Sequence, residues 1–376
     1  MAAKGREDDI LAAMEAISMA GDAYIPYDEL LLKCTQCAGG ISGAQFHEDI
    51  AMLLQDGVLH REGERIYLPN IWQAEASAAD NLFEMLLHNK IRAVMALPHR
   101  PCASLLLDPM QQEAVAMALT HRISIVLGGA GTGKSTLIQA IVENWSSKTS
   151  DFILCAPTGK AAQNLRERLQ LPAYTVHGAL GKLPGESFLS DEKWEGISLI
   201  IVDEASMLTL EMLAGLLCKA TRHCHMVLLG DPNQLLSLGA GNVLQDLQRI
   251  GVPGICLNKP YRQRNAEKAL YHNIAHFPNI ASIDDLHFDD SFLLWVAPEE
   301  RIPEIICDEA AKMYRSGESV QVLSHFNKAT DYSVAALNDG LKKMVNQDGR
   351  QNLILQYGGM TYYHGDRVMI TSNDSQ

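Results

Sequence analysis

The sequence predicts an α/β protein in which a parallel sheet, covered by helices on both faces, follows an N-terminal helical region. From Leu105 onward, short apolar segments alternate with segments of helical periodicity. The apolar segments are nearly continuous, as in strands that are buried on both faces. The expected strands are residues 123–129, 152–157, 199–204 and 225–231. Helices are expected to begin after Pro109, at Lys134, at Gly159 and at Thr209.

Residues 8–70 predict three short helices followed by a hairpin. Apolar residues recur at helical spacing from Ile10 onward, and residues 58–69 carry a turn at Gly63 between two short alternating strands. This order is typical of a winged helix. The expected recognition helix, residues 43–56, contains no Lys or Arg. Because phosphate contacts supply most nonspecific affinity for DNA, we expect a structural or partner-binding element rather than a DNA reader.

Length and composition limit the class of protein. A chain of 376 residues predicts two or three domains, and 47% hydrophobic with 20% charged residues excludes a disordered or low-complexity chain. No apolar run reaches the roughly 18 residues that span a bilayer, so we expect a cytoplasmic protein without a membrane partner. The net charge of −14 argues against a protein that holds nucleic acid by bulk electrostatic attraction, although it does not exclude a local basic channel. A helix over residues 72–97 and a Pro-bounded linker, 97–102, predict a domain boundary near residue 103.

The chain has eight cysteines, of which only Cys34 and Cys37 form a close pair. A single C-x-x-C without a second pair favours packing thiols in a reducing compartment over a zinc site.

The strongest motif is GGAGTGKS at residues 128–135, which fits G-x-x-x-x-G-K-[ST]. In this motif glycines let successive backbone N–H groups point at phosphates, while Lys134 adds positive charge and Ser135 can ligate Mg²⁺. The motif follows an apolar strand and opens a helix, which favours a P-loop over a chance Gly-rich turn. We predict that ATP is bound by Gly128, Gly129, Ala130, Gly131, Thr132, Gly133, Lys134, Ser135 and Thr136.

A second motif, IIVDEAS at residues 200–206, ends a buried strand in two acids. Strand ends of this kind project side chains toward the phosphate site at the carboxyl edge of a parallel sheet. We expect Asp203 to hold Mg²⁺ through water and Glu204 to orient and deprotonate the attacking water. The alternative is a strand that stops in two solvent-facing acids.

Another apolar strand runs into the polar loop GDPNQ, residues 230–234, which is the third motif. Gln234, placed near the γ-phosphate, could sense hydrolysis by hydrogen bonding. Taken alone, the same residues predict an ordinary turn.

In this serial order the motifs resemble those of the superfamily-one DNA helicases, and within them the RecD-like ATP-dependent helicases. The resemblance covers residues from about 70 to 376. LDPMQQEAV, residues 107–115, resembles the adenine-reading Q motif, with Gln111 as its glutamine. LNKPYRQ, residues 257–263, resembles motif IV, whose arginine, here Arg262, reaches the γ-phosphate from the second motor domain.

Two further segments, APTGKAAQNL and TVHGAL, resemble motifs Ia and Ib, which contact single-stranded DNA in this family. The resemblance assigns DNA contacts to Pro157, Thr158, Gly159, Lys160, Thr175 and His177. Each weaker motif has a plainer interpretation. Gln111 could be a polar helix residue, Thr158 and Lys160 a helix cap and first turn, His177 a loop histidine and Arg262 a surface arginine.

Two departures from the family pattern stand out. Between Ser324 and Tyr332 the family's Pro and Gly-rich turn is replaced by HFNKATD. The chain also ends at Gln376, before the family's motifs V and VI and a second arginine. We therefore expect a truncated form with impaired unwinding.

The resemblance implies three regions: a winged-helix and helical region over residues 1–103, a P-loop RecA-like motor domain over 104–258, and a partial RecA-like domain over 259–376. It implies ATP hydrolysis coupled to 5′–3′ movement on single-stranded DNA in repair or recombination, with possible protein partners at the N-terminal region. The alternatives are a P-loop ATPase that is not a helicase, and an inactive partner-bound subunit resembling an exodeoxyribonuclease V alpha chain. Stimulation by single-stranded DNA separates the first alternative from a helicase.

Overall fold

The computed structural model forms two compact units, one over Met1–Arg264 and one over Asn265–Asp374. The structure describes residues 2–36, 42–87, 107–129, 131–145, 152–181, 194–221, 223–234, 237, 239–259, 268–276, 280–328, 330–345, 353–357 and 360–363.

The first unit begins with the helices and hairpin that the sequence predicts. The helices are α1 (Ala2–Met19), α2 (Tyr27–Gln36) and α3 (Gly43–Gln55), and the strands are β1 (Ile25–Pro26), β2 (His60–Glu62) and β3 (Arg65–Tyr67). The strands pair antiparallel in the order β1-β3-β2. Gly63 makes the β2–β3 turn at a φ of +61°, a left-handed conformation that glycine adopts without strain. Ile10, Phe46 and Ile66 are fully buried at the centre of this region, which has the element order of a winged helix.

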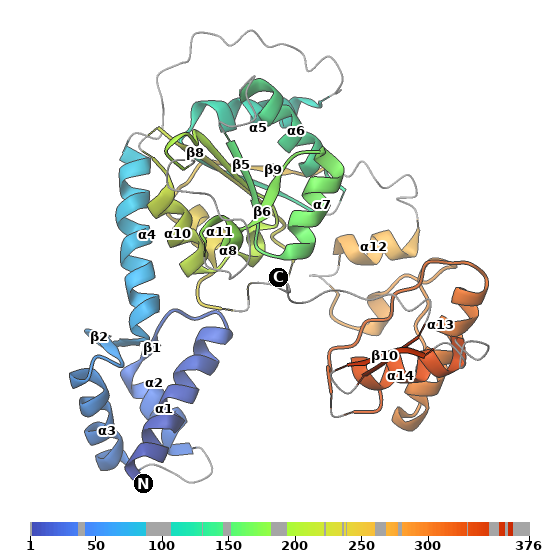
Figure 1. Ribbon diagram of the computed structural model, residues 1–376, viewed down its shortest axis with the longest axis horizontal. Helices are drawn as coiled ribbons and strands as arrows, with labels where there is room; N and C mark the ends of the chain where they lie inside the picture. Colours follow the sequence, from blue (N-terminus) through green and yellow to red (C-terminus); the bar gives the residue numbers. More distant parts are fainter. Residues whose placement is uncertain are drawn as a thin grey trace. The chain divides into compact units, whose positions relative to one another are not determined.

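Helix α4 (Pro69–Leu87) connects these elements to the large sheet (Figure 1). Its apolar side chains, including Ala78 and Leu82, enter the same core as the sheet and pack beside α10 (Leu210–Lys219). Asn70 Nδ2 at its start donates to Glu211 Oε1 over 3.0 Å. The predicted continuation of this helix toward residue 97 and the predicted linker lie outside the described residues.

The large sheet has six parallel strands in the order β6-β5-β7-β8-β4-β9. Four of them are the predicted ones, namely β4 (Ile123–Gly128), β5 (Phe152–Ala156), β7 (Leu199–Val202) and β8 (His225–Gly230). The edge strands β6 (Ala173–Thr175) and β9 (Gly254–Leu257) were not predicted, because they are short and carry no long apolar run. The predicted fold class, a parallel α/β sheet, is confirmed.

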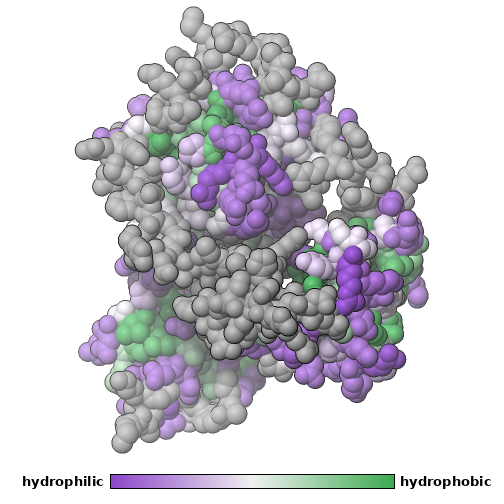
Figure 2. All heavy atoms as spheres, turned by 45° about the vertical axis from the view of Figure 1, so that its right-hand side comes forward, coloured by the Kyte–Doolittle hydropathy of each residue, from purple (hydrophilic) through white to green (hydrophobic). Residues whose placement is uncertain are grey.

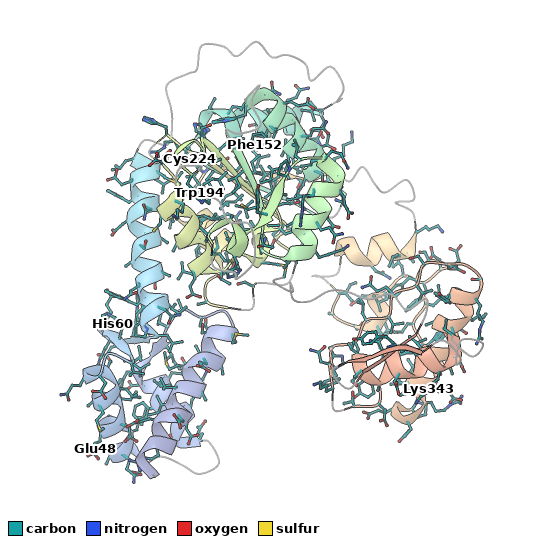
Figure 3. The ribbon with its side chains drawn as sticks, viewed as in Figure 1. Glu48, His60, Phe152, Trp194, Cys224 and Lys343 are labelled. Atoms are coloured by element: carbon teal, nitrogen blue, oxygen red, sulfur yellow. The ribbon has the colours of Figure 1, made fainter. Side chains whose placement is uncertain are left out.

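Helices cover both faces of this sheet, and successive strand residues enter opposite layers. Ile125 packs in the layer that contains α4 and α10, whereas Val126 packs in the layer that contains α5 and α6. The helices of the second layer and of the connections are α5 (Pro109–Thr120), α6 (Lys134–Trp145), α7 (Gly159–Leu169), α8 (Val176–Ala179), the 3₁₀ turn η1 (Ala205–Met207) and α11 (Val243–Arg249). Phe152, Trp194 and Cys224 lie in these two layers (Figure 3). Burial on both faces explains why the strands are apolar along their whole length.

The second unit contains α12 (Ala269–His276), η3 (Ile283–Asp285), η4 (Glu299–Arg301), α13 (Ile302–Arg315), α14 (Val334–Val345) and the antiparallel strands β10 (Leu353–Tyr357) and β11 (Met360–Tyr363). Helices α13 and α14 pack closely, since a Cβ at Gly340 would lie 3.0 Å from Cys307 Sγ. Leu293, Val296 and Leu323 are 67%, 88% and 82% exposed, and Figure 2 shows hydrophobic side chains, in green, at the visible surface of this unit. A partial RecA-like domain over residues 259–376 stays a prediction, because the strand pair within the described part of this unit is antiparallel.

Two features concern membranes and metals. Within the described ranges, none of the helices combines the length and the apolar composition that a bilayer crossing needs. The thiols of Cys155 and Cys224 are buried and are not in disulfides, as expected of packing cysteines, and Cys37 lies outside the described residues. Among the residues that are described, His, Cys, Asp and Glu side chains form no cluster that could hold a metal by themselves.

Candidate active site

The predicted motifs follow neighbouring strands at the carboxyl edge of the large sheet. The P-loop follows β4, the GDPNQ loop follows β8, and Asp203 with Glu204 follows β7, so three adjacent strands carry the three nucleotide motifs. The segments assigned to DNA follow β5 and β6, the next two strands. After these predicted roles, we call the loops that follow β7, β8 and β4 the nucleotide half of the edge and the loops that follow β5 and β6 the DNA half.

Close packing explains the first glycine of the P-loop. A Cβ at Gly128 would lie 2.5 Å from Thr132 Oγ1, which is too near unless Thr132 moves, and 3.2 Å from Leu257 Cβ, which is a tight contact. Gly131 and Gly133 have φ angles of +80° and +89°, in the left-handed region that favours glycine. Thr132 Oγ1 donates to Gly129 O over 2.9 Å and ties the loop to itself. Ala130 lies outside the described residues.

Lys134 and Ser135 open helix α6 directly after this loop. Lys134 Nζ donates to Gly128 O and, over 3.3 Å, to Gly129 O, so the amine is held by carbonyl groups of its own loop. Ser135 Oγ accepts a hydrogen bond of 3.3 Å from Arg168 Nη1, near the end of α7. A bound phosphate would give Lys134 a stronger partner than the two carbonyls, because hydrogen bonds between charged groups are shorter and stronger.

Asp203 carries the strongest electrostatic perturbation of the site, and its neighbour Glu204 is strained. Burial, followed by the neighbouring Glu204 charge, raises the pKa of Asp203 to about 6, and hydrogen bonding to the Glu204 amide with the charges of Lys134 and Arg168 partly offsets this rise. Glu204 adopts a left-handed φ of +54°, which costs about 1 kcal/mol or more for a residue with a side chain. Its Oε2 is buried without a hydrogen-bond partner. Strain and an unsatisfied carboxylate at one residue are typical of a functional position rather than of a strand that stops in solvent.

Ser206 and Asp231 join two of the motif loops, and sequence reasoning missed both. Ser206 Oγ donates to Asp231 O over 2.9 Å and accepts from Asp231 N over 2.8 Å. Gly230 permits this approach, because a Cβ there would lie 2.9 Å from Ser206 Oγ. The Ser of DEAS and the Asp of GDPNQ were both visible in the sequence, but their pairing depends on β7 and β8 being neighbours.

Gln234 lies in the same loop as Asp231 and is exposed, with its backbone N donating to Asp231 O over 3.2 Å. Asp231 is only 6% exposed, and a Cβ at Gly129 would lie 4.0 Å from its Oδ2. The acid of this loop therefore lies close to the P-loop, whereas the sensing role of Gln234 stays a prediction.

Gln111 is buried and bonded at both ends of its amide. Its Oε1 accepts from Asp108 N over 3.2 Å in a capping box, and its Nε2 donates to Thr132 O over 3.3 Å. The side chain thus connects the start of α5 to the P-loop. Adenine reading by Gln111 stays a prediction.

In the DNA half of the edge, threonine hydroxyl groups cap the helices that follow the strands. Ala156 at the end of β5 pairs with Thr175 at the end of β6, which brings the two predicted DNA segments together. Thr158 Oγ1 accepts from Ala161 N over 3.2 Å and caps α7, as in the plainer interpretation, and Thr175 Oγ1 accepts from Gly178 N over 2.9 Å and caps α8.

The remaining residues of this half differ in exposure. Gly159 and Lys160 are exposed, His177 is partly buried, and Pro157 is buried. The predicted arginine finger, Arg262, lies outside the described residues.

Comparison with known proteins identifies relatives for most of the chain. The AAA domain family matches residues 106–287. The RecBCD enzyme subunit RecD of Buchnera aphidicola is 29% identical over 84% of this chain and 65% of its own length, and that of Mycolicibacterium smegmatis is 29% identical over 86% and 64%. The ATP-dependent RecD2 DNA helicase of Deinococcus radiodurans is 31% identical over 62% of this chain and 33% of its own length.

A solved structure, Bacteroides Pif1 bound to ssDNA, is 20% identical and covers 55% of this chain and 57% of that chain, with a TM-score of 0.37. The chain spans slightly less than two thirds of the length of the two RecD relatives. The predicted resemblance to RecD-like proteins is confirmed.

Proposed function

We propose that this chain is an ATP-dependent motor that moves on single-stranded DNA, as the ATPase part of a RecD-like DNA helicase. The observation that carries the proposal is the nucleotide half of the edge, where a P-loop, an acid pair and a third polar loop follow three adjacent parallel strands. The similarity to RecD and RecD2 proteins over most of the chain supports the same function.

The residues of the nucleotide half fit ATP with Mg²⁺. A divalent cation near Ser135 and Asp203 would favour the ionised form of a carboxylate whose pKa burial and Glu204 raise. When bound, Mg²⁺ neutralises phosphate charge and polarises the transferred group. Ser135 and Asp203 would hold the metal, and Lys134 would bind the β- and γ-phosphates.

Glu204 is the residue of this chain that would activate water. Its Oε2 is buried and lacks a partner, so the oxygen is available to accept a proton or a hydrogen bond from a water molecule. Gln234, one strand away, would contact the γ-phosphate, and Arg262 would add charge from the C-terminal part of the chain.

The DNA half would bind the nucleic acid. Exposed Lys160 would contact a phosphate, and the loops that hold Thr158 and Thr175 would bring backbone groups to the strand. Because β5 is the neighbour of β7, movement of the Asp203–Glu204 loop during hydrolysis could reach the DNA loops directly. We further propose 5′–3′ movement, a role in DNA repair or recombination, a cytoplasmic location, and protein partners at the N-terminal region.

The test is ATP hydrolysis by the full chain with Mg²⁺, measured with and without a single-stranded oligonucleotide. The proposal predicts hydrolysis that single-stranded DNA stimulates and that duplex DNA of the same length stimulates less. Hydrolysis that DNA does not change would favour a P-loop ATPase of another kind. Absence of both nucleotide binding and hydrolysis would favour a subunit without its own activity.

A further inference from the structure

Arg168 is a charged side chain that contacts the nucleotide half and that the motif analysis did not single out. It lies in the last turn of α7, and its Nη1 donates to Ser135 Oγ over 3.3 Å. Ser135 Oγ is also the atom through which this residue would ligate Mg²⁺. A helix of the DNA half therefore brings a cation to an oxygen that a metal would take.

The two adjacent carboxyl groups of Asp203 and Glu204 favour a positive charge beside them. Asp203 and Glu204 are adjacent carboxyl groups, and the positive charges that act on Asp203 come from Lys134 and Arg168. Lys134 Nζ is engaged with the carbonyl oxygens of the P-loop. Arg168 is thus a cation that contacts a predicted metal ligand.

We propose that Arg168 is a stand-in for the metal: in the nucleotide-free protein its guanidinium holds Ser135, and Mg²⁺ displaces it when the metal–nucleotide complex binds. The inference rests on the proposed ATP function. A guanidinium and a divalent cation at one hydroxyl oxygen repel each other over a few ångströms. Arg168 is an exposed residue, so its side chain can move into solvent without opening the core.

Displacement has two consequences for nucleotide binding. Without Arg168, Mg²⁺ no longer competes with a protein cation, so metal-dependent binding is unchanged or tighter. Without Arg168 and without metal, the phosphates meet one positive charge fewer, so metal-free binding is weaker. Both effects widen the ratio of the Kd in EDTA to the Kd in Mg²⁺.

The experiment titrates a fluorescent ATP analogue into the full chain, in Mg²⁺ and in EDTA. We expect Arg168→Gln to raise the EDTA-to-Mg²⁺ ratio of Kd values about fivefold, the size expected for a charge contact at an exposed position. Arg168→Lys keeps the charge and should stay near the wild-type ratio. Arg166→Gln removes the same charge from an exposed position about 200° further round the same helix and should leave the ratio unchanged.

Two results would overturn the proposal. An unchanged ratio in Arg168→Gln would show that the contact with Ser135 has no role in metal binding, and an equal loss of affinity in both conditions would show a plain phosphate ligand. Failure of the wild-type chain to bind the analogue in either condition would instead contradict the proposed ATP function, so the two failures are distinguishable. A thermal melt of each variant in EDTA verifies that the fold is retained.

Discussion

The nucleotide half and the DNA half of the sheet edge are made of the same parts, loops that follow buried parallel strands and open helices, yet they differ in what their polar atoms do. In the nucleotide half, Glu204 Oε2 is buried without a partner and its backbone is left-handed. In the DNA half, the hydroxyls of Thr158 and Thr175 are already used as helix caps, and Lys160 is exposed. The first half thus contains a buried polar atom without a partner, whereas the polar groups of the second half are either hydrogen-bonded within the protein or exposed.

This difference predicts large effects of substitution in the nucleotide half and small ones in the DNA half. The largest is expected for Glu204→Gln, which removes the proposed base but keeps a side chain that can hydrogen-bond. Turnover of ATP should fall about a hundredfold or more, with the affinity for ATP little changed. Steady-state hydrolysis and analogue binding measure the two quantities separately.

Glu113→Gln is the matched control for this substitution, since Glu113 is an exposed acid on α5. It should leave turnover unchanged. If Glu204→Gln hydrolysed ATP at the wild-type rate, the assignment of the base would be wrong.

Asp203→Asn tests whether the buried charge of Asp203 destabilises the folded protein. The folded-state pKa of about 6 lies above the ordinary value of 3.8, so the native protein binds the proton more tightly than the unfolded chain does. The stability that the protonated form provides is therefore present below pH 3.8 and is lost as the pH rises through about 6. Without metal at pH 7.5, Asp203→Asn should melt at a higher temperature than the wild type, because the variant has no charge buried at this position. Its free energy of unfolding should be larger by up to about 3 kcal/mol.

Thermal unfolding in EDTA at pH 7.5 and at pH 5 gives the comparison. The advantage of Asp203→Asn should shrink at pH 5, where wild-type Asp203 is largely protonated. Equal stabilities of the two proteins at both values would contradict the electrostatic explanation.

Two glycines provide a matched pair across the edge. A Cβ at Gly128 would lie 2.5 Å from Thr132 Oγ1, whereas a Cβ at Gly159 would meet nothing within 4 Å. Gly128→Ala should distort the P-loop, cost about 1–3 kcal/mol and abolish tight nucleotide binding. Gly159→Ala, in the first turn of α7, should be neutral or slightly stabilising. Chemical unfolding with analogue binding decides this, and a Gly128→Ala protein with normal affinity would show that the loop has more room than the structure gives it.

The features that could be predicted from the sequence are those that a local residue pattern enforces. The four apolar strands and the P-loop were predictable because burial on both faces and the crowding at Gly128 each force a local residue pattern. Strands β6 and β9 were not, because three or four residues at a sheet edge need no long apolar run.

Long-range pairs explain the rest of what was missed. The bonds of Ser206 to Asp231 and of Arg168 to Ser135 depend on which strands and helices are neighbours in space. The types of these residues alone do not reveal which strands and helices are neighbours. Thr158 was predicted both as a cap and as a DNA contact, and the cap is confirmed.

The most direct test of two distinct sites on one sheet edge compares Lys134→Ala with Lys160→Ala for two ligands, a fluorescent ATP analogue and a labelled single-stranded oligonucleotide. We predict that Lys134→Ala weakens nucleotide binding about ten- to a hundredfold and leaves binding of the oligonucleotide without nucleotide unchanged. Lys160→Ala should leave the nucleotide affinity unchanged. In a plot of the log of the DNA association constant against the log of the salt concentration, it should make the negative slope shallower by about 0.7, which corresponds to the loss of one phosphate contact. If both variants lost the same ligand, or if Lys160→Ala left the salt dependence of DNA binding unchanged, the division of this edge into a nucleotide half and a DNA half would be wrong.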